Sequence, residues 1–401
     1  MKRTINVAIL VASAYSLMTA QVAIKGAVVY TMAGAPIKDG VVLLKDGKVE
    51  RVGPASSFTI PANYKVLSGA VVTPGIVDAH STVGLSGILN IPADQMQLEK
   101  SDAFQPELRA IDAYNPREPL VEFVRNLGIT TLHTGHAPGA LASGTTIVVK
   151  PIGGTVQEAM IDPGMGAFTL GSNVQSTYKN PGTSGKAVAT LRGEFIKAQD
   201  YTKKLFAKDP EKRPSRDLKM ELLSRILAGE VRILYTAQRA TEIMTVLRLQ
   251  KEFGFKLVLD GAAEAYLVLD EIKKAGVPVI LHPTMVRPNG DTRNVSMETA
   301  AMLKAAGIPF ALQSGFEGYV PKTRVVLFEA ALAAANGLSF DDALAAITIN
   351  AARIIGVDNR VGSLEPGKDG DVVVFDGDPF EYTTHVCGVV INGTVVSEKC
   401  H

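Results

Sequence analysis

The sequence contains no tryptophan, only two cysteines and no excess of either charge. Its 401 residues include 6% aromatic residues, and 41 Lys+Arg face 40 Asp+Glu, for a net charge of +1. This balance provides no basic surface of the kind that attracts nucleic acid or anionic lipid, so we expect neither as a partner. A hydrophobic fraction of 46% excludes a disordered chain and indicates a large globular core.

Long apolar runs are scarce as well. The run INVAILVASAYSLMTA, residues 5–20, follows Lys2 and Arg3. It is short for a membrane span. A basic start, an apolar middle and small residues at the end are typical of a secretory signal peptide cut near Ala20. The sequence therefore predicts an exported protein, periplasmic or secreted, with no stable membrane insertion after cleavage.

The two cysteines lie near the C-terminus, on either side of a predicted hairpin. An Asn392-Gly393 turn favours a type I′ hairpin. In an unbroken ladder this turn places Cys387 opposite Glu398, with Cys400 further along. A disulfide requires Cα atoms within about 7 Å, so we expect free thiols.

Short apolar runs alternate with amphipathic stretches over most of the chain, which is typical of parallel βαβ units. Glycines between the helices and the strands fit helix C-caps. Such an alternation predicts an α/β fold, a (β/α)8 TIM-like barrel, although the third run could also belong to an inserted hairpin. The eight predicted strands are Val71–Val77, Ile129–His133, Thr145–Val149, Ala167–Leu170, Val231–Tyr235, Lys256–Leu259, Val277–Leu281 and Ile308–Leu312.

Strand-and-turn sequence without helices flanks this barrel at both ends. We therefore expect four segments: the signal peptide (1–20), the N-terminal part of a β-domain (21–72), the barrel (73–356) and the C-terminal part of the β-domain (357–401). The simplest packing is one small β-sandwich built from both chain ends.

Three stretches resemble the amidohydrolase superfamily of metal-dependent hydrolases. TPGIVDAHS (73–81) is similar to its first barrel strand, and RVGSLEPGKDGDVVVFDGDP (360–379) to its return to the β-domain. FALQSGFEGYVPKTRVVLFEAALAAANG (310–337) is most similar to exported relatives of imidazolonepropionase. The resemblance implies hydrolysis at the barrel mouth by a metal-activated water.

The resemblance also implies a ligand set that this chain largely lacks. The family pattern is a His-x-His on the first strand, Lys or Glu on the fourth, one His each on the fifth and sixth, and an Asp on the eighth. His80 matches the first histidine, and the fourth strand offers no Lys or Glu. The other positions hold Thr82, Gln238, Asp260 or Gly261, and Gly315.

Other polar residues follow barrel strands and would open onto the same face. His80, His133 and His136 are the predicted ligands of a single divalent metal, zinc being the expected ion. Asp260 and Glu317 are the predicted catalytic acid–base residues. The predicted substrate-binding residues are His282, Gln238, Arg239 and Arg324.

Three functions follow from this set. The first is a hydrolase of non-peptide C–N bonds, in amides, cyclic amides or imides, with a diverged single-metal site. The second is a pseudo-enzyme that binds a small ligand in the same fold, with histidines as hydrogen-bond partners. The third is catalysis by carboxylate and histidine without metal. In each case the partner is a small molecule, and homo-oligomers are usual for such a fold.

Overall fold

The structure is a computed structural model that describes residues 21–89, 91–285, 287–316 and 326–401. The predicted signal peptide, Glu317 and Arg324 lie outside these residues. No helix in the described ranges combines the length and the apolar composition needed to cross a membrane.

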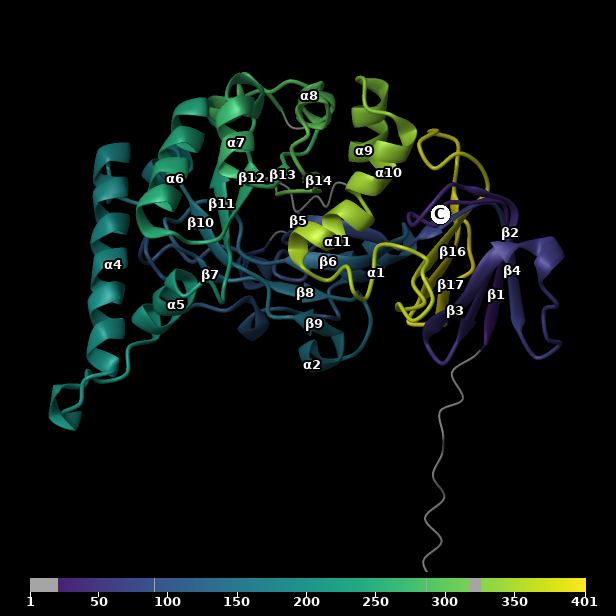
Figure 1. Ribbon diagram of the computed structural model, residues 1–401, viewed down its shortest axis with the longest axis horizontal. Coiled ribbons are helices and arrows are strands. Elements are labelled where there is room, and N and C mark those ends of the chain that lie inside the picture. Colours follow the sequence, from purple (N-terminus) through teal and green to yellow (C-terminus); the bar gives the residue numbers. More distant parts are fainter. Residues whose placement is uncertain (1–20, 90, 286, 317–325) are drawn as a thin grey trace, which may run out of the picture.

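The two chain ends share one β-sheet, seen at the right of Figure 1. Its seven strands run in the order β17-β16-β15-β4-β1-β2-β3. The β-domain predicted from both chain ends is one continuous sheet, because β4 pairs in parallel with β1 and antiparallel with β15 and so joins the two halves. The strands are β1 (Val22–Val29), β2 (Ile37–Lys45), β3 (Lys48–Pro54), β4 (Lys65–Pro74), β15 (Val372–Phe375), β16 (Val386–Ile391) and β17 (Thr394–Ser397).

The remaining strands form a six-stranded and a four-stranded sheet, with orders β14-β13-β12-β11-β10-β7 and β5-β6-β8-β9. They adjoin at a parallel bridge between Ser81 and Gly315. The result is a TIM-barrel-like α/β arrangement. The strands are β5 (Ile76–Ser81), β6 (Ile129–Thr134), β7 (Gly144–Thr145), β8 (Ile147–Val149), β9 (Met160–Asp162), β10 (Gly166–Thr169), β11 (Ile233–Ala237), β12 (Leu257–Gly261), β13 (Val279–Leu281) and β14 (Phe310–Leu312).

Every predicted strand overlaps an observed one, with two corrections. The run Val71–Val77 is divided: β4 belongs to the shared sheet and ends at Pro74, and β5 begins the barrel at Ile76. The run Thr145–Val149 splits into β7 and β8, and β8 pairs antiparallel with both β6 and β9. Apolar composition reveals a strand but not its direction, so the inserted-hairpin alternative describes this region better than a parallel strand.

Helices cover the outside of the strands, with α4 outermost at the left of Figure 1. Gly254, Gly276 and Gly307 take the left-handed conformation at the ends of α6, α7 and α8, as their spacing predicts. The helices are α1 (Pro119–Asn126), α2 (Val156–Ala159), α3 (Ser172–Thr177), α4 (Ser184–Leu205), α5 (Leu218–Leu227), α6 (Ala240–Phe253), α7 (Leu269–Ala275), α8 (Thr299–Ala306), α9 (Val326–Ala335), α10 (Phe340–Ala346) and α11 (Ile349–Ile355).

One layer of buried apolar side chains fills the inside of the strands. Leu234, Val258, Ile280 and Ala311, from β11 to β14, pack in one cluster with residues of α11. Successive side chains on a strand alternate between its two faces. The residue two positions further along each of these strands therefore points inward again, one layer nearer to the carboxyl ends.

Cys387 and Cys400 form a disulfide, which corrects the predicted free thiols. The ladder between β16 and β17 is not regular: its register shifts between Val389 and Val390. Beyond this shift, Val386 and His401 exchange both backbone hydrogen bonds, at 3.2 and 3.0 Å. The irregular pairing brings the two cysteines opposite each other, with Cα atoms 3.9 Å apart. A bulge of this kind leaves no mark in the hairpin sequence.

Removing this disulfide should destabilise the shared sheet. The Cys387→Ser, Cys400→Ser double variant loses a cross-link with a sequence separation of 13, so we expect its free energy of unfolding to fall by about 2–3 kcal/mol. Urea denaturation of the variant and of the oxidised protein measures the difference. A change below about 0.5 kcal/mol would show that the cross-link closes a segment already held by the sheet.

Candidate functional site

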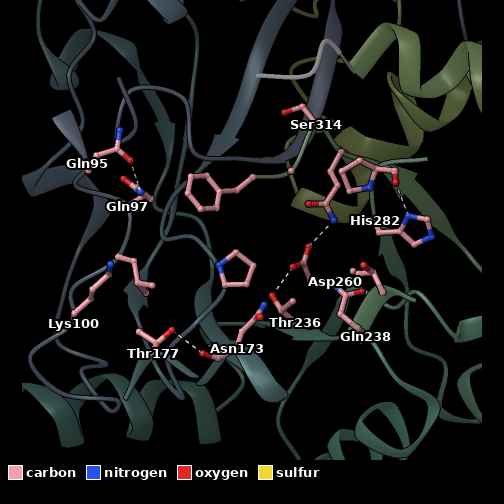
Figure 2. Close-up of a pocket in the computed structure, with 18 residues that line it drawn as sticks. Gln95, Gln97, Lys100, Asn173, Thr177, Thr236, Gln238, Asp260, His282 and Ser314 are labelled. Carbon is pink, nitrogen blue, oxygen red and sulfur yellow. Dashed lines mark hydrogen bonds between the residues drawn. The ribbon is translucent and has the colours of Figure 1, made fainter. Parts of the chain in front are cut away.

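A cavity of about 570 Å³ opens at the carboxyl ends of the inner strands. Thr236 and Asp260 line it from β11 and β12, and His282 and Gln313 directly follow β13 and β14. Figure 2 shows Thr236, Asp260 and His282 around this space. Each stands two positions beyond a residue of the buried apolar layer, so strand alternation points all four into the same space. This is the face on which TIM barrels carry their active sites.

The Asp260 carboxylate contacts three polar side chains at this cavity. Its Oδ1 atom lies 2.9 Å from His80 Nδ1 and accepts a hydrogen bond of 2.9 Å from Gln313 Nε2. Its Oδ2 atom accepts a hydrogen bond of 2.5 Å from the Thr236 hydroxyl (Figure 2). The register shift between Asp78 and Ser81 in β5 interrupts the alternation there and accompanies the inward turn of His80. Three strands and β5 thus converge on one carboxylate.

His80 and Asp260 are both buried and form an ion pair when His80 is protonated. Burial disfavours the charged form of His80, but the charge of Asp260 and its hydrogen bond raise the pKa of His80 above its ordinary value. Burial likewise opposes the charge of Asp260, but His80 and the hydrogen-bond donors lower the pKa of this carboxyl. Asp78, which accepts hydrogen bonds from the backbone and hydroxyl of Ser314, has a pKa raised to about 6 by burial.

The His80–Asp260 pair should give the protein a specific pH dependence of stability. The contribution of His80 is fully present below its unfolded pKa of 6.5 and is lost as the pH rises through the raised folded pKa. The contribution of Asp260 is present above 3.8 and is lost as the pH falls through the lowered folded pKa. We expect the stability difference between the wild type and His80→Gln to shrink at alkaline pH in urea unfolding.

The matched control is His385→Gln on the shared sheet. His385 also lies 2.9 Å from a carboxylate, that of Asp376, but both side chains are about half exposed. An exposed pair of this kind contributes little to stability. The stability difference between the wild type and His80→Gln should change with pH more than the difference between the wild type and His385→Gln. Equal pH dependence of the two differences would contradict the buried ion pair.

The other two predicted metal ligands, His133 and His136, do not face the cavity. His133 Nδ1 lies 2.7 Å from the backbone oxygen of Ala79, and His133 Nε2 lies 2.6 Å from the Thr146 hydroxyl. Both ring nitrogens are therefore occupied. His136 is buried, and its Nε2 has no partner among the described residues. Burial lowers the pKa of His133 to about 3 and that of His136 to about 4, so both are neutral at physiological pH.

Two of the positions where the family pattern expects ligands are packed against other groups. Gly315 has a φ of +68°, and a Cβ atom there would lie 2.6 Å from Pro283 Cγ. An aspartate at this position would strain the backbone and displace the proline. Thr82 is buried, and its hydroxyl accepts a hydrogen bond of 3.0 Å from Ser86. The surroundings of both positions are thus adapted to residues that bind no metal.

The predicted substrate-binding residues divide into two groups. Gln238 and His282 line the cavity. His282 Nδ1 bonds to the backbone oxygen of Pro283 at 2.6 Å, and burial lowers its pKa to about 4, so the ring is neutral. Arg239 is not among the residues that line the cavity, and its Nε atom lies 2.9 Å from Glu242 and 3.3 Å from Asp291.

The described residues do not form a metal centre of the predicted kind. Within the described ranges, no three His, Cys, Asp or Glu side chains are arranged to hold an ion. A catalytic zinc site typically needs three protein ligands and one open position. Of the three predicted ligands, only His80 contacts the cavity carboxylate. It does so through Nδ1, and its Nε2 is buried without a hydrogen-bond partner among the described residues.

The opposite wall of the cavity comes from the long connection between β5 and α1. Gln95, Gln97 and Lys100 lie across the cavity from Asp260 (Figure 2). Gln97 Oε1 is buried and has no hydrogen-bond partner in the described part of the chain. These residues were not predicted as site residues, and neither were Thr236 and Gln313. The only sequence signals were the length of the connection and the spacing of two residues from the apolar strand centres.

Known proteins agree with this architecture. A profile of the Amidohydrolase family matches residues 245–396. A solved amidohydrolase from Thermotoga maritima is 30% identical, covers 94% of this chain and 100% of its own, and superposes with a TM-score of 0.88. An imidazolonepropionase from Rhizorhabdus wittichii is 24% identical over 86% of this chain and 91% of its own length.

A third relative, amidohydrolase tasK from Hapsidospora irregularis, is 24% identical over 88% of this chain. The match spans only 39% of that protein, so most of its length has no counterpart here. The matches to the Thermotoga and Rhizorhabdus proteins, in contrast, extend over nearly the whole of those chains. By sequence and by fold, the chain belongs to the amidohydrolase family.

Proposed function

We propose that this protein hydrolyses a C–N bond other than a peptide bond in a small, polar substrate. The observation that carries the proposal is the buried Asp260 carboxylate, which faces the cavity at the carboxyl end of β12. Homologues named imidazolonepropionase and deaminase support the same class of reaction.

Asp260 would act as the acid–base group. A water molecule attacks the carbonyl carbon of the substrate and gives its proton to Asp260, and the protonated carboxyl then gives that proton to the leaving nitrogen as the C–N bond breaks. His80 Nδ1 lies 2.9 Å from Asp260 Oδ1 and would orient this carboxylate. Gln238 Oε1 accepts from the backbone of Ala263, so its Nε2 is the donor available to the substrate carbonyl.

No step of this proposal passes through a metal ion. The diverged single-metal site stays a prediction that the described donors do not favour, since His133 has both ring nitrogens engaged and Gly315 is packed against Pro283. Glu317 lies outside the described residues, so its catalytic role also stays a prediction.

A ligand-binding protein without turnover is the second candidate. The observation that favours it is that both oxygens of the Asp260 carboxylate already have partners. They contact His80, Thr236 and Gln313. A carboxylate with a lowered pKa and three partners is a weak base. In this case the cavity would keep the ligand and the polar residues would recognise it.

One experiment separates the two candidates. Hydantoin, dihydrouracil, succinimide and para-nitroacetanilide are incubated with the purified protein, and ring opening or amine release is followed by absorbance and by mass spectrometry. Turnover of any compound above the rate in buffer supports hydrolysis. An increase of the melting temperature without turnover supports the binding protein. If no compound is turned over and none raises the melting temperature, both candidate functions are contradicted for the compounds of this panel.

Three further expectations belong to the proposal. The protein would be exported, so that it meets its substrate in the periplasm or outside the cell. Its partner would be a small molecule rather than a nucleic acid or a membrane. Self-association into homo-oligomers would fit the fold family.

A further inference from the structure

Three residues that line the cavity come from three different connections. Asn173 lies near the start of α3, Gln238 lies between β11 and α6, and Thr292 lies between β13 and α8. Asp291 directly precedes Thr292, and its carboxylate contacts the sequence neighbours of the other two. One side chain therefore joins the three connections just behind the cavity wall.

The contacts of Asp291 are short and largely shielded. Its Oδ2 accepts hydrogen bonds of 2.7 Å from both the backbone N–H and the hydroxyl of Ser172. Its Oδ1 lies 3.3 Å from Arg239 Nε, which Glu242 also holds at 2.9 Å. The side chain of Asp291 is only 10% exposed. Gly171 permits this approach, because a Cβ atom there would lie 3.0 Å from Asp291 Oδ2.

Polar contacts of this kind are what holds the connection between β13 and α8. From residue 287 to residue 298 no residue belongs to the buried apolar core. Besides the contacts of Asp291, Asn294 donates a hydrogen bond of 2.6 Å to Glu264, and Asn294 O accepts one of 3.0 Å from Tyr266. Segments with few buried apolar contacts open at low free-energy cost. The position of this connection therefore depends on a few charged and polar groups.

We propose that Asp291 is a positioning residue, which holds the 287–298 connection against the cavity and sets the spacing of the three lining residues around a ligand. It touches no substrate itself. It acts through its neighbours, since Ser172 precedes Asn173 and Arg239 follows Gln238. The proposal rests on the proposed function only in placing the ligand in this cavity.

A single engineered thiol tests the proposal without any known substrate. Both native cysteines are in the disulfide, so Thr292→Cys adds one free thiol at the cavity wall. Its rate of reaction with dithionitrobenzoate, a bulky reagent, is compared with and without Asp291→Ala. Asp291→Ala removes the charge-assisted hydrogen bonds to Ser172, so we expect the labelling rate of Cys at position 292 to rise at least about tenfold.

The control is Glu298→Ala in the same Thr292→Cys protein. It removes an exposed carboxylate of the same connection that is not among the contacts of Asp291. We expect its labelling rate to stay within about twofold of the parent. Asp291→Asn keeps an oxygen that can accept from Ser172, so it should restore part of the protection. Equal labelling rates for Asp291→Ala and the parent would overturn the proposal.

A folding defect is separated from the proposed effect by circular dichroism and by the melting temperature. Both should change little, because the connection contributes no residue to the apolar core. Hydrogen exchange then gives a second readout: faster exchange limited to the three connections supports the proposal, and faster exchange throughout the barrel contradicts it. For any compound that is turned over, Asp291→Ala should raise KM far more than it changes kcat. Labelling requires no turnover, so a failure of the hydrolase proposal leaves this result intact.

Discussion

Replacing Asp260 with Asn should lower kcat/KM for a C–N substrate by about 10²–10⁴-fold, the usual contribution of an acid–base residue. The substitution keeps the shape of the side chain but removes the group that would accept the proton from water. It also turns one acceptor into a donor, which opposes the hydrogen bond from Gln313 or Thr236. Initial rates with the compound found active in the panel measure the effect.

The matched control for this variant is Asp376→Asn on the shared sheet, an exposed aspartate that also pairs with a histidine. Its activity should equal that of the wild type. Asp260→Asn must also remain folded, because it leaves the buried His80 without its counter-charge. A folded Asp260→Asn protein with full turnover would rule out Asp260 as the acid–base group.

Replacing Lys150 with Met should lower the free energy of unfolding by about 3–5 kcal/mol, the usual cost of breaking a buried ion pair from one side. Lys150 Nζ lies 2.7 Å from Asp369 Oδ2 and 2.9 Å from Asp371 Oδ2, and it also bonds to the side chain of Asn392. The side chain of Lys150 is 1% exposed. The variant would leave Asp371, whose pKa is already raised by burial, without its cation.

Lys48 provides the comparison, since it pairs with the same Asp369 at 2.6 Å but is 50% exposed. Lys48→Met should cost at most about 1 kcal/mol. Lys150 follows β8 of the barrel, and its partners directly precede β15 or follow β16 of the shared sheet. The expected defect is therefore a loosened junction between the two. Equal unfolding free energies for the two variants, from urea denaturation, would contradict this role of Lys150.

The strands could be predicted because buried runs of Val, Ile and Leu are visible in any sequence. Strand direction and sheet partners could not, since Thr145–Val149 has the same composition whether its strand is parallel or antiparallel. Lys150 gave no signal either. Its partners are more than two hundred residues away in the chain, so nothing near it marks a buried cation.

The site was predicted in part, for physical reasons that differ by residue. His80 and Asp260 follow strands in the sequence, and the structure brings them together at 2.9 Å. His133 has the same sequence signal, but the Thr146 hydroxyl occupies its second nitrogen, and this contact depends on the unexpected course of β8. Gln313 follows an apolar run and has no sequence feature that marks it as a site residue. Only strand alternation places it beside Asp260.

If Asp260 supports hydrolysis in this cavity as we propose, turnover does not depend on a resident metal ion. The most direct test measures metal content and turnover on the same sample, purified without chelator, and repeats both after chelation and dialysis. We predict far less than one ion per chain and an unchanged rate after chelation. About one zinc or similar ion per chain, with turnover lost on chelation and restored by adding zinc, would contradict metal-free hydrolysis by Asp260.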